Sequence, residues 1–428
     1  MAGTNMGLNR DQQAGFMDVI NFINGPDQFM DISGGAGTGK TYFISQVADG
    51  ILRHKDKNCP LHTVAITATT NKAAAVIAQA MPHRAGEIGT VYSFMNLRLS
   101  ENYSQGTTSV VPTKKWMVHS GILLIIDECS MINKELYKWL LKGLDSTCKV
   151  LFVGDKNQLA PVKEVLSPIY LQGYKGSLLT IPVRNAGQQA LMDLCEQMKE
   201  TVLTGVFTPI TEVPGVIDFI DGTTLKGVLE REYLKEDPGK RIISYTNKRV
   251  IEYNSYIRQI RGYSEPFEVD EILSNNASAE LLGKERLYTD QIVRVLKIEN
   301  DYMDPNIVKG HDIRTITMLV EDVMSMNQYT VTAFADPKHR DEAMKYYSSR
   351  RQWDRYFKIK NAFPDLRSVA ASTTHKAQGS TYDSVIVDLA DIGKSTNREQ
   401  TARMQYVALS RPRSRIFIRG KLPERYFE

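Results

Sequence analysis

The most informative stretch of the sequence is "MDISGGAGTGKTYFI" (residues 30–44). In it, an apolar run is followed by a glycine-rich segment and then by a second apolar run. Residues 34–41 match the pattern G-x-x-x-x-G-K-[ST]. Glycine allows a tight loop whose backbone N–H groups converge on a phosphate, and the helix that follows adds the positive end of its dipole. In this pattern the lysine reaches the β- and γ-phosphates and the Ser/Thr hydroxyl binds Mg²⁺. We therefore predict a loop that binds nucleotide through Gly35, Gly37, Thr38, Gly39, Lys40 and Thr41. A merely flexible turn is the alternative reading.

Composition sets broad limits on the protein class. The chain has 428 residues, 42% hydrophobic and 24% charged, as is ordinary for a globular protein with a sizeable core. The length predicts about two to four domains. A formal net charge of +4 permits nucleic-acid binding without requiring it. The four cysteines have no metal-ligand spacing, and no signal-peptide core or long apolar run occurs. We expect a cytoplasmic protein with reduced thiols and no membrane span.

Strand-like runs alternate with helix-like stretches along the chain. The first set of strand-like runs covers residues 62–69, 121–128 and 148–155, with helical patterns at 71–81 and 133–144. The runs are short, continuously apolar and rich in β-branched residues, which suits strands buried on both faces of a parallel sheet. A second set covers residues 240–247, 384–390 and 415–420. The alternation predicts an α/β fold with two α/β domains.

Two segments interrupt this alternation. Residues 96–118 alternate in polarity around a Ser-Gln-Gly turn, which predicts an inserted β-hairpin. Residues 266–365 contain scattered strand-like pieces and predict a small β-rich inserted domain. Its last part, residues 338–360, has eight Lys/Arg against three acids with interleaved aromatic residues. It is interpreted as one helix that either faces nucleic acid, braces a domain or simply buries its aromatic side.

Acidic and amide side chains follow two of the predicted strands. Asp127 and Glu128 end the strand-like run at 121–128, and Gln158 follows the run at 148–155. Carboxylates at the carboxyl ends of parallel strands face a phosphate loop across the sheet edge. Asp127 is expected to help bind Mg²⁺, Glu128 to polarise the attacking water, and Gln158 to contact water and γ-phosphate.

Two arginines are candidates for stabilising charge on the γ-phosphate. Arg411 lies in "QYVALSRPRSR" (405–415), within the second set of α/β elements, and Arg184 lies in "LTIPVRN" (179–185). An arginine from a neighbouring domain can stabilise the transition state of phosphoryl transfer. Isolated arginines more often lie at the surface or in ion pairs, so sequence context must decide.

Together these stretches resemble the B branch of the superfamily-one helicases, in particular Dda-type and RecD-type enzymes. The matching motifs occur in order over most of the chain: "LNRDQQAGF" (8–16), "GGAGTGKT" (34–41), "ATTNKAA" (68–74), "GTVYSF" (89–94), "DECSM" (127–131), "GDKNQLAPV" (154–162), Arg184, "SYTNKRVIEYN" (244–254), "STTHKAQGSTYDSV" (372–385) and "YVALSRPR" (406–413). The combination of "THKAQG" with "ALSR" is the most specific part of this match. The resemblance strengthens the assignment of Arg184 and Arg411 to the γ-phosphate.

The resemblance implies two RecA-like motor domains with ATP and Mg²⁺ bound between them. Motor domain 1A would comprise residues 1–90 and 119–180, with a hairpin or pin insertion 1B at 91–118. Motor domain 2A would comprise residues 181–265 and 366–428, with an SH3-like insertion 2B at 266–365 that braces the pin. Gln12 is expected to read adenine, and Gln378 and Gly379 to contact the nucleotide.

The resemblance also implies a track for single-stranded DNA over both motor domains. The expected contacts are Thr70, Asn71, Lys72, Thr90, Tyr92, Thr246, Asn247, Lys248, Thr373 and His375. Hydroxyl, amide and lysine groups can contact phosphates, and aromatic faces can stack on bases of any sequence. The family usually has Pro where Thr69 stands and His where Tyr92 stands, which affects the DNA contacts rather than the ATPase. Tyr92 can equally be an aromatic at the edge of the core.

The expected activity is ATP-driven translocation 5′→3′ on single-stranded DNA with strand separation at duplex junctions. Tyr103 and Trp116 are candidate pin aromatics, with Trp116 favoured as a residue that packs the hairpin onto its domain. A phage or plasmid enzyme of DNA replication that acts as a monomer is expected, with a single-strand-binding protein or replication proteins as partners. A viral RNA helicase and a nucleotide-dependent loader that does not unwind are the alternatives.

Overall fold

The computed structural model describes residues 7–53, 61, 63–161, 164–183, 187–281, 285–308 and 311–428. The chain divides into two compact units. Unit 1 comprises Met1–Arg98, Val110–Phe219 and Ala377–Glu428, and unit 2 comprises Leu99–Ser109 and Ile220–Lys376. Within the described residues, no helix is both long enough and apolar enough to cross a bilayer.

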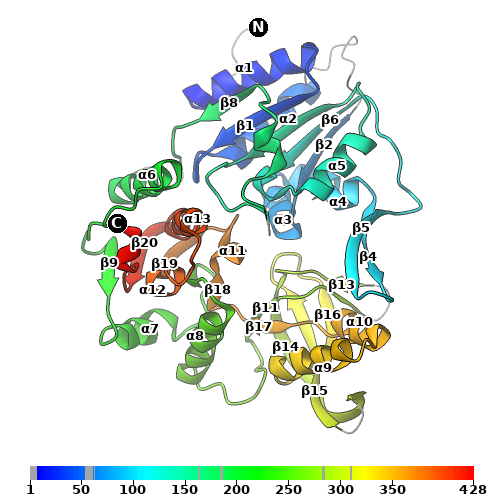
Figure 1. Cartoon of the computed structure of the whole chain (residues 1–428), viewed down its shortest axis with the longest axis vertical. Coiled ribbons are helices and arrows are strands. Elements are labelled where there is room, and N and C mark those ends of the chain that lie inside the picture. Colours follow the sequence, from blue (N-terminus) through cyan, green and yellow to red (C-terminus); the bar gives the residue numbers. More distant parts are fainter. Residues whose placement is uncertain are drawn as a thin grey trace. The chain divides into compact units, whose positions relative to one another are not determined.

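Unit 1 contains a six-stranded parallel sheet in the order β3-β2-β6-β7-β1-β8 (Figure 1). Its strands are β1 (Phe29–Gly34), β2 (Thr63–Ala68), β3 (Ile88–Thr90), β6 (Ile122–Asp127), β7 (Lys149–Gly154) and β8 (Gly176–Leu179). The predicted runs at 62–69, 121–128 and 148–155 are therefore β2, β6 and β7. All six residues of β7 are buried, as expected for a central parallel strand.

Helices cover both faces of this sheet, and alternate strand residues enter two separate cores. Leu123 and Ile125 of β6 pack with α1 (Arg10–Asn24), α2 (Lys40–Arg53) and α3 (Asn71–Ala80). Leu124 and Ile126 face the opposite way, toward α4 (Val91–Phe94) and α5 (Lys134–Gly143). Packing against helices therefore holds the sheet on both faces. The loops that follow its strands begin at the carboxyl edge of the sheet.

The second set of α/β elements contributes to both units. In unit 1, α6 (Gln189–Thr204) packs against α13 (Arg398–Leu409), and the strands run in the order β19 (Tyr382–Asp388), β20 (Pro412–Arg419) and β9 (Ile217–Ile220). β19 and β20 are parallel. In unit 2, β10 (Lys240–Ser244) pairs in parallel with β18 (Ala371–Thr373), beside α7 (Leu225–Tyr233) and α8 (Asn247–Ile260). Two short helices, α11 (Thr374–Ala377) and α12 (Leu389–Ile392), complete the set.

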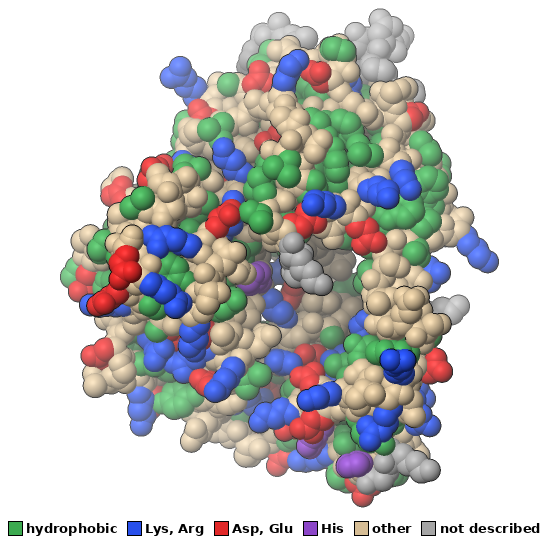
Figure 2. All heavy atoms as spheres, in the orientation of Figure 1, with side chains coloured by type: hydrophobic (Ala, Val, Ile, Leu, Met, Phe, Trp, Pro, Cys, Tyr) green, Lys and Arg blue, Asp and Glu red, His purple; other side chains and the backbone are tan. Residues whose placement is uncertain are grey.

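Unit 2 also holds a five-stranded antiparallel sheet in the order β16-β15-β14-β11-β17. Its strands are β11 (Ile272–Asn275), β14 (Ile292–Val308), β15 (His311–Asp322), β16 (Gln328–Phe334) and β17 (Leu366–Ser368), and a small pair joins β12 (Ala279–Glu280) to β13 (Arg286–Leu287). Its core includes Val293, Met318 and Val331. Figure 2 shows basic and acidic side chains interspersed over the visible surface, in keeping with the small net charge.

The basic aromatic stretch at 338–360 differs from its prediction as one helix. It forms α9 (Pro337–Ser349) and α10 (Trp353–Ala362), separated by a break. Arg351 in the break has φ 53°, a left-handed backbone conformation that ends a helix. Arg340 of α9 donates to the backbone oxygens of Phe363 and Lys360, so it fastens α9 to the end of α10. The predicted hairpin at 96–118 forms β4 (Leu97–Asn102) and β5 (Thr107–Pro112).

Candidate functional site

The glycine-rich loop connects β1 to α2 and wraps around its own lysine. Gly37 and Gly39 have φ values of 82° and 77°, which L side chains rarely adopt, so both positions depend on glycine. The Lys40 ammonium donates hydrogen bonds to the backbone oxygens of Gly34 at 2.8 Å and Gly35 at 3.0 Å. The loop is therefore closed around a cation that faces the place where phosphates bind in this motif.

Gln12 joins the start of α1 to this loop. Its Oε1 accepts from the backbone N–H of Asn9 at 3.2 Å, as part of a capping box, and its Nε2 donates to the Thr38 oxygen at 3.1 Å. The side chain is buried. Because both ends of the amide are bonded within the protein, Gln12 fixes the loop relative to α1 in this structure.

The acidic pair at the end of β6 is buried beside the loop lysine. Burial and the neighbouring Glu128 carboxylate raise the pKa of Asp127, whereas the Lys40 ammonium lowers it. Glu128 has φ 53°, a conformation that is uncommon outside glycine and that often marks functional sites. Its backbone N–H donates to Asp127 Oδ1 at 2.8 Å, and its Oε2 has no hydrogen-bond partner among the described residues. The two carboxylates are therefore positioned to contact a bound ligand as well as protein atoms.

Thr69, at the position where the family usually has Pro, supports this acidic pair. Its hydroxyl donates to the backbone oxygen of Glu128 at 3.3 Å. Thr69 is buried next to Thr70, whose side chain caps α3. The departure from the family pattern thus gives the loop after β6 an additional hydrogen bond.

The polar loop after β7 is organised by Asp155. The Asp155 carboxylate accepts from the Asn157 N–H at 3.0 Å and from Gln158 Nε2 at 3.3 Å. Gln158 is buried, and its Oε1 has no hydrogen-bond partner among the described residues. An amide oxygen held in this way can accept a hydrogen bond from a water or a hydroxyl group.

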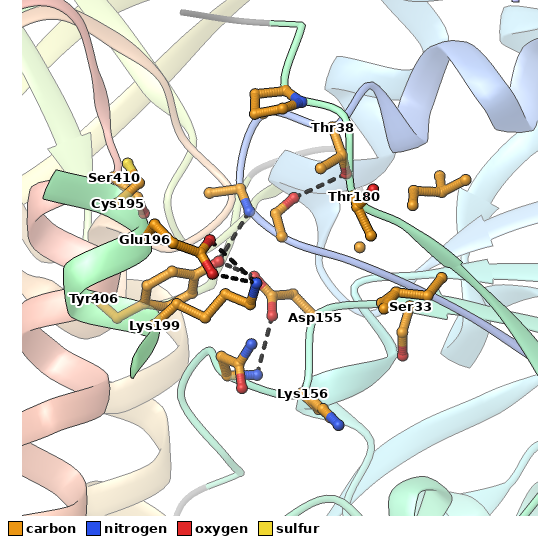
Figure 3. Close-up of a pocket in the computed structure, with 18 of the residues that line it drawn as sticks. Ser33, Thr38, Asp155, Lys156, Thr180, Cys195, Glu196, Lys199, Tyr406 and Ser410 are labelled. Atoms are coloured by element: carbon orange, nitrogen blue, oxygen red, sulfur yellow. Dashed lines mark hydrogen bonds and ion pairs between the residues drawn. The ribbon is translucent and has the colours of Figure 1, made fainter. Parts of the chain in front are cut away.

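A cavity of about 330 Å³ adjoins the glycine-rich loop (Figure 3). Its first wall consists of residues 33–38 and 155–157 from the six-stranded sheet. A second wall comes from α6, through residues that include Cys195, Glu196 and Lys199, and from Tyr406 and Ser410 at the end of α13. Glu196 and Lys199 pair with each other at 2.9 Å. The two sets of α/β elements therefore meet around the loop within unit 1.

The predicted arginines occupy different positions with respect to this cavity. Arg411 follows Ser410, a lining residue, but is itself buried. Its Nε donates to the Val407 oxygen at 2.8 Å and its Nη2 to Ser410 Oγ at 2.8 Å. In this structure its guanidinium is thus bonded within its own part of unit 1. Arg184 lies outside the described residues.

Gln378 and Gly379 lie beside the acidic pair. Gln378 Nε2 donates to Ser130 Oγ at 3.2 Å, and a Cβ at Gly379 would lie 3.5 Å from Glu128 Oε1. Gly379 has φ 73°, a backbone conformation that favours glycine. The end of the "THKAQG" motif and the "DECSM" motif are therefore in contact.

Three of the threonines expected to contact DNA are helix N-caps. The hydroxyls of Thr70, Thr90 and Thr246 accept from the backbone N–H groups of Ala73, Ser93 and Arg249, at the starts of α3, α4 and α8. This arrangement places Asn71 and Lys72 in the first turn of α3, and Asn247 and Lys248 in the first turn of α8. Helix N-termini favour phosphate groups.

The remaining expected DNA contacts and pin residues have varied environments. Tyr92 packs against the core on the α4–α5 face of the sheet, as does Trp116, whose ring lies 6.2 Å from that of Trp139. Thr373 accepts from the Lys376 N–H at 3.4 Å, and His375 is exposed. Tyr103 lies at the hairpin tip, 5.0 Å from the ring of Phe357 on α10.

Comparison with known proteins assigns the chain to a family. Residues 22–164 match a model described as an AAA domain, and residues 368–418 match one described as a UvrD-like helicase C-terminal domain. The ATP-dependent DNA helicase dda of Enterobacteria phage T4 is 23% identical over 456 residues, covering 96% of this chain and 98% of that protein. The chain is therefore similar, over nearly its whole length, to an ATP-dependent DNA helicase of the kind that its sequence motifs resemble. The chain is also 23% identical to the uncharacterized protein R530 of Acanthamoeba polyphaga mimivirus, over 96% of this chain and 99% of that one.

The fold of this chain agrees with that of a solved helicase structure. A crystal structure of the Pif1 helicase from Bacteroides, in complex with ADP-AlF3 and ssDNA, has 16% sequence identity and a TM-score of 0.53. The match covers 98% of this chain and 94% of that one. The α/β class with two RecA-like parts, predicted from the sequence, is therefore confirmed.

Sequence reasoning missed three residues of the candidate site. Asp155 and Tyr406 lie inside quoted motifs, as the second residue of "GDKNQ" and the first of "YVALSR", but no role was inferred for either. Arg403, one turn before Tyr406 on α13, donates to the backbone oxygens of Lys156 at 2.5 Å and Gln158 at 2.9 Å. Their contacts join positions about 250 residues apart, which no local pattern can reveal.

Proposed function

We propose that this protein is an ATP-dependent DNA helicase that moves 5′→3′ along single-stranded DNA and separates duplex DNA. The observation that carries the proposal is the cavity beside the glycine-rich loop, which α6 and the end of α13 border from the second α/β set. A nucleotide in such a cavity contacts both sets, so its hydrolysis can change their spacing. The polarity rests on family membership.

We propose that the chain is organised into two motor domains and two insertions. Motor domain 1A comprises residues 1–90 and 119–180, and motor domain 2A comprises residues 181–265 and 366–428. The pin insertion comprises residues 91–118, and the inserted β-domain comprises residues 266–365. The glycine-rich loop and the acidic pair belong to motor domain 1A, and the "THKAQG" and "ALSR" motifs belong to motor domain 2A.

Hydrolysis requires a charged clamp and an activated water. Lys40 would exchange its two loop carbonyl oxygens for the β- and γ-phosphates. The unpartnered Oε2 of Glu128 and Oε1 of Gln158 suit the attacking water, which needs one group to take its proton and another to orient it. The strained backbone at Glu128 supports a catalytic role for this residue.

The same residues fit a magnesium ion. Mg²⁺ is bound by one or two protein oxygens together with phosphates and water, and the Thr41 hydroxyl and Asp127 carboxylate can supply these oxygens. A cation also favours the ionised form of Asp127, whose pKa is raised by burial and by Glu128. Bound there, the ion would neutralise charge that develops on the phosphates.

The two arginines would respond to the triphosphate. Arg411 is held by Val407, Ser380 and Ser410, beside the cavity rather than in it. We propose that the γ-phosphate draws Arg411 out of these contacts and that Arg184 joins it. Release of phosphate would return Arg411 to its carbonyl partners, which provides the alternation that a motor needs.

Single-stranded DNA would bind at the capped helix N-termini. The first turns of α3 and α8 each combine free backbone N–H groups with an asparagine and a lysine. Thr90, Tyr92, Thr373 and His375 are the further proposed contacts. Such contacts read the DNA backbone and therefore do not depend on base sequence.

The contacts that hold the hairpin against α10 favour strand separation over a function in which the protein loads onto DNA without unwinding it. Within unit 2, Glu101 accepts from Asn361 Nδ2 at 2.9 Å and from Lys360 Nζ at 3.3 Å. These contacts, with the Tyr103–Phe357 pair, fasten the hairpin tip to α10. A rigid hairpin can obstruct one strand while the motor pulls the other, which a loader does not require.

The proposed setting is DNA replication at single-strand/duplex junctions. A single-strand-binding protein or other replication proteins are the proposed protein partners, and one copy of the chain is proposed to suffice. Both curated relatives named above come from viruses. The cytosol, or that of an infected host, is the proposed compartment.

Nucleic-acid-stimulated hydrolysis and strand displacement test the function together. ATP turnover is measured with poly-dT and poly-U, and displacement is measured on a tailed DNA duplex, for the wild type and Lys40→Ala. We expect strong stimulation by poly-dT and ATP-dependent displacement, both abolished in the variant. Preferential stimulation by poly-U would favour an RNA helicase, and DNA-stimulated turnover without displacement would favour a loader.

A further inference from the structure

Helix α13 reaches the loops of the nucleotide site through one buried hydroxyl group. Tyr406 is 1% exposed. Its hydroxyl donates to Asp155 Oδ2 at 2.7 Å and accepts from the backbone N–H of Ala36 at 2.9 Å (Figure 3). Ala36 belongs to the glycine-rich loop, and Asp155 begins the polar loop after β7. One side chain of the second α/β set therefore bonds to both loops of the first set.

The Asp155 carboxylate, which accepts from Tyr406, also holds the side chain of Gln158. Asp155 Oδ2 accepts from Gln158 Nε2 at 3.3 Å, besides accepting from Tyr406. The bonds form a continuous chain from Ala36 through Tyr406 and Asp155 to Gln158. Arg403, on the same helix, donates to the backbone oxygens of Lys156 and Gln158. A shift of α13 would thus be transmitted to Gln158.

The hydroxyl, rather than the aromatic ring, carries this connection. Burial and the Asp155 carboxylate raise the pKa of Tyr406 well above its usual range, so the phenol remains a donor. A Cβ at Gly35 would lie 3.3 Å from the hydroxyl oxygen, so the loop passes close to the phenol. Removing the oxygen would leave a buried Asp155 acceptor and the Ala36 N–H without this partner.

We propose that Tyr406 is a positioning residue for ATP hydrolysis, which sets Gln158 and the glycine-rich loop according to the position of α13. The inference rests on the proposed function and deepens it. Arg411 lies two residues beyond the end of α13, so the same helix carries both the arginine proposed to meet the γ-phosphate and the tyrosine that orients Gln158. Inward movement of the arginine and correct placement of the glutamine would then occur together.

The test is a kinetic cycle of Tyr406→Phe, Asp155→Asn and the double variant. DNA-stimulated ATP hydrolysis is measured over a range of ATP concentrations at saturating oligo-dT. Each single variant should lower kcat about tenfold while KM for ATP changes less than about threefold, as for loss of one hydrogen bond that matters mainly in the transition state. The double variant should be no slower than the slower single variant, since both changes act on the same Tyr406–Asp155 bond.

Tyr426→Phe is the matched control. Tyr426 is another buried tyrosine of unit 1, and its hydroxyl bonds to Ser395 and Thr401 away from the cavity. It should lower the melting temperature as much as Tyr406→Phe does, with kcat unchanged. Wild-type kcat in Tyr406→Phe, multiplicative losses in the double variant, or equal kcat losses in both phenylalanine variants would overturn the proposal. If the wild type itself shows no DNA-stimulated hydrolysis, the proposed function fails instead.

If Tyr406→Phe does not fold, the kcat and KM of Asp155→Asn alone test the proposal. It keeps the ring and only replaces a charged acceptor with a neutral one, so a kcat loss at unchanged KM still supports the proposal. An unchanged kcat overturns it.

Discussion

The indole ring of Trp353 lies directly on Gly106. A Cβ atom built on Gly106 would come within 2.4 Å of the ring, and the backbone of Gly106 has φ 66° at the hairpin turn. Trp353 is the first residue of α10, so the break at Arg350–Gln352 brings its ring to the tip of the hairpin. The hairpin and the helix therefore form one packed element within unit 2.

Removing this contact should uncouple strand separation from hydrolysis. Trp353→Ala takes away the ring that supports the hairpin, and Gly106→Ala forces a side chain into it at an unfavourable φ. Both variants should lose about five- to tenfold in displacement rate, while DNA-stimulated ATP turnover stays within about twofold. Displacement of a fluorescent strand and phosphate release are measured on the same samples.

Arg355→Ala is the control for the hairpin variants, because Arg355 is an exposed residue of the same helix. It should leave both rates near those of the wild type. An equal fall in hydrolysis and displacement for Trp353→Ala would contradict the role of the hairpin as a separate strand-blocking element.

Nucleotide should shield Cys195 from alkylation. Cys195 lines the cavity beside the glycine-rich loop, whereas Cys129 and Cys148 are buried. In a Cys59→Ser background, modification of Cys195 by a maleimide should slow at least about fivefold when a non-hydrolysable ATP analogue and Mg²⁺ are added. Peptide mass spectrometry measures the site and rate. Equal rates with and without nucleotide would place the nucleotide outside this cavity.

Most residues of the proposed nucleotide site could be selected from the sequence because its motifs are local. The glycine-rich loop and the acids at the end of β6 are set by residues within a few positions of each other, and continuous apolar runs defined the central strands. The connection from Tyr406 to Asp155 could not be predicted, since it depends on how α13 packs against distant loops. The division of residues 338–360 into two helices was also missed, because neither Gly nor Pro marks the break.

The N-cap threonines show a different limit. Thr70, Thr90 and Thr246 were selected for DNA contact, and the structure shows that each hydroxyl also accepts from a helix backbone N–H. The polar residue type agrees with either use, so the sequence pattern alone could not distinguish a cap from a contact. At Thr70 and Thr90 the two uses are compatible, because a hydroxyl group that accepts a hydrogen bond can also donate one.

The stability of the nucleotide-free protein should fall as pH rises from about 4 to about 7 and then level off. Burial and Glu128 raise the pKa of Asp127 to about 7, above its value in the unfolded chain. The folded state then retains a proton that the unfolded state has released, so its advantage is lost as pH rises through the raised pKa. Asp127→Asn should become more stable relative to the wild type above pH 7, by a few degrees in Tm.

Magnesium and ADP provide the complementary measurement. They should flatten the wild-type dependence of Tm on pH, because a bound cation favours the ionised carboxylate. Scanning fluorimetry over the pH range provides both curves. Parallel curves for Asp127→Asn and the wild type would show that Asp127 does not hold the extra proton.

We propose that ATP hydrolysis beside the glycine-rich loop drives 5′→3′ movement that separates DNA strands. Displacement from one duplex carrying either a 5′ or a 3′ single-stranded tail tests it most directly. We predict rapid, ATP-dependent displacement with the 5′ tail and little with the 3′ tail. Displacement from the 3′-tailed duplex alone, or from neither while ATP is hydrolysed, would contradict the claim.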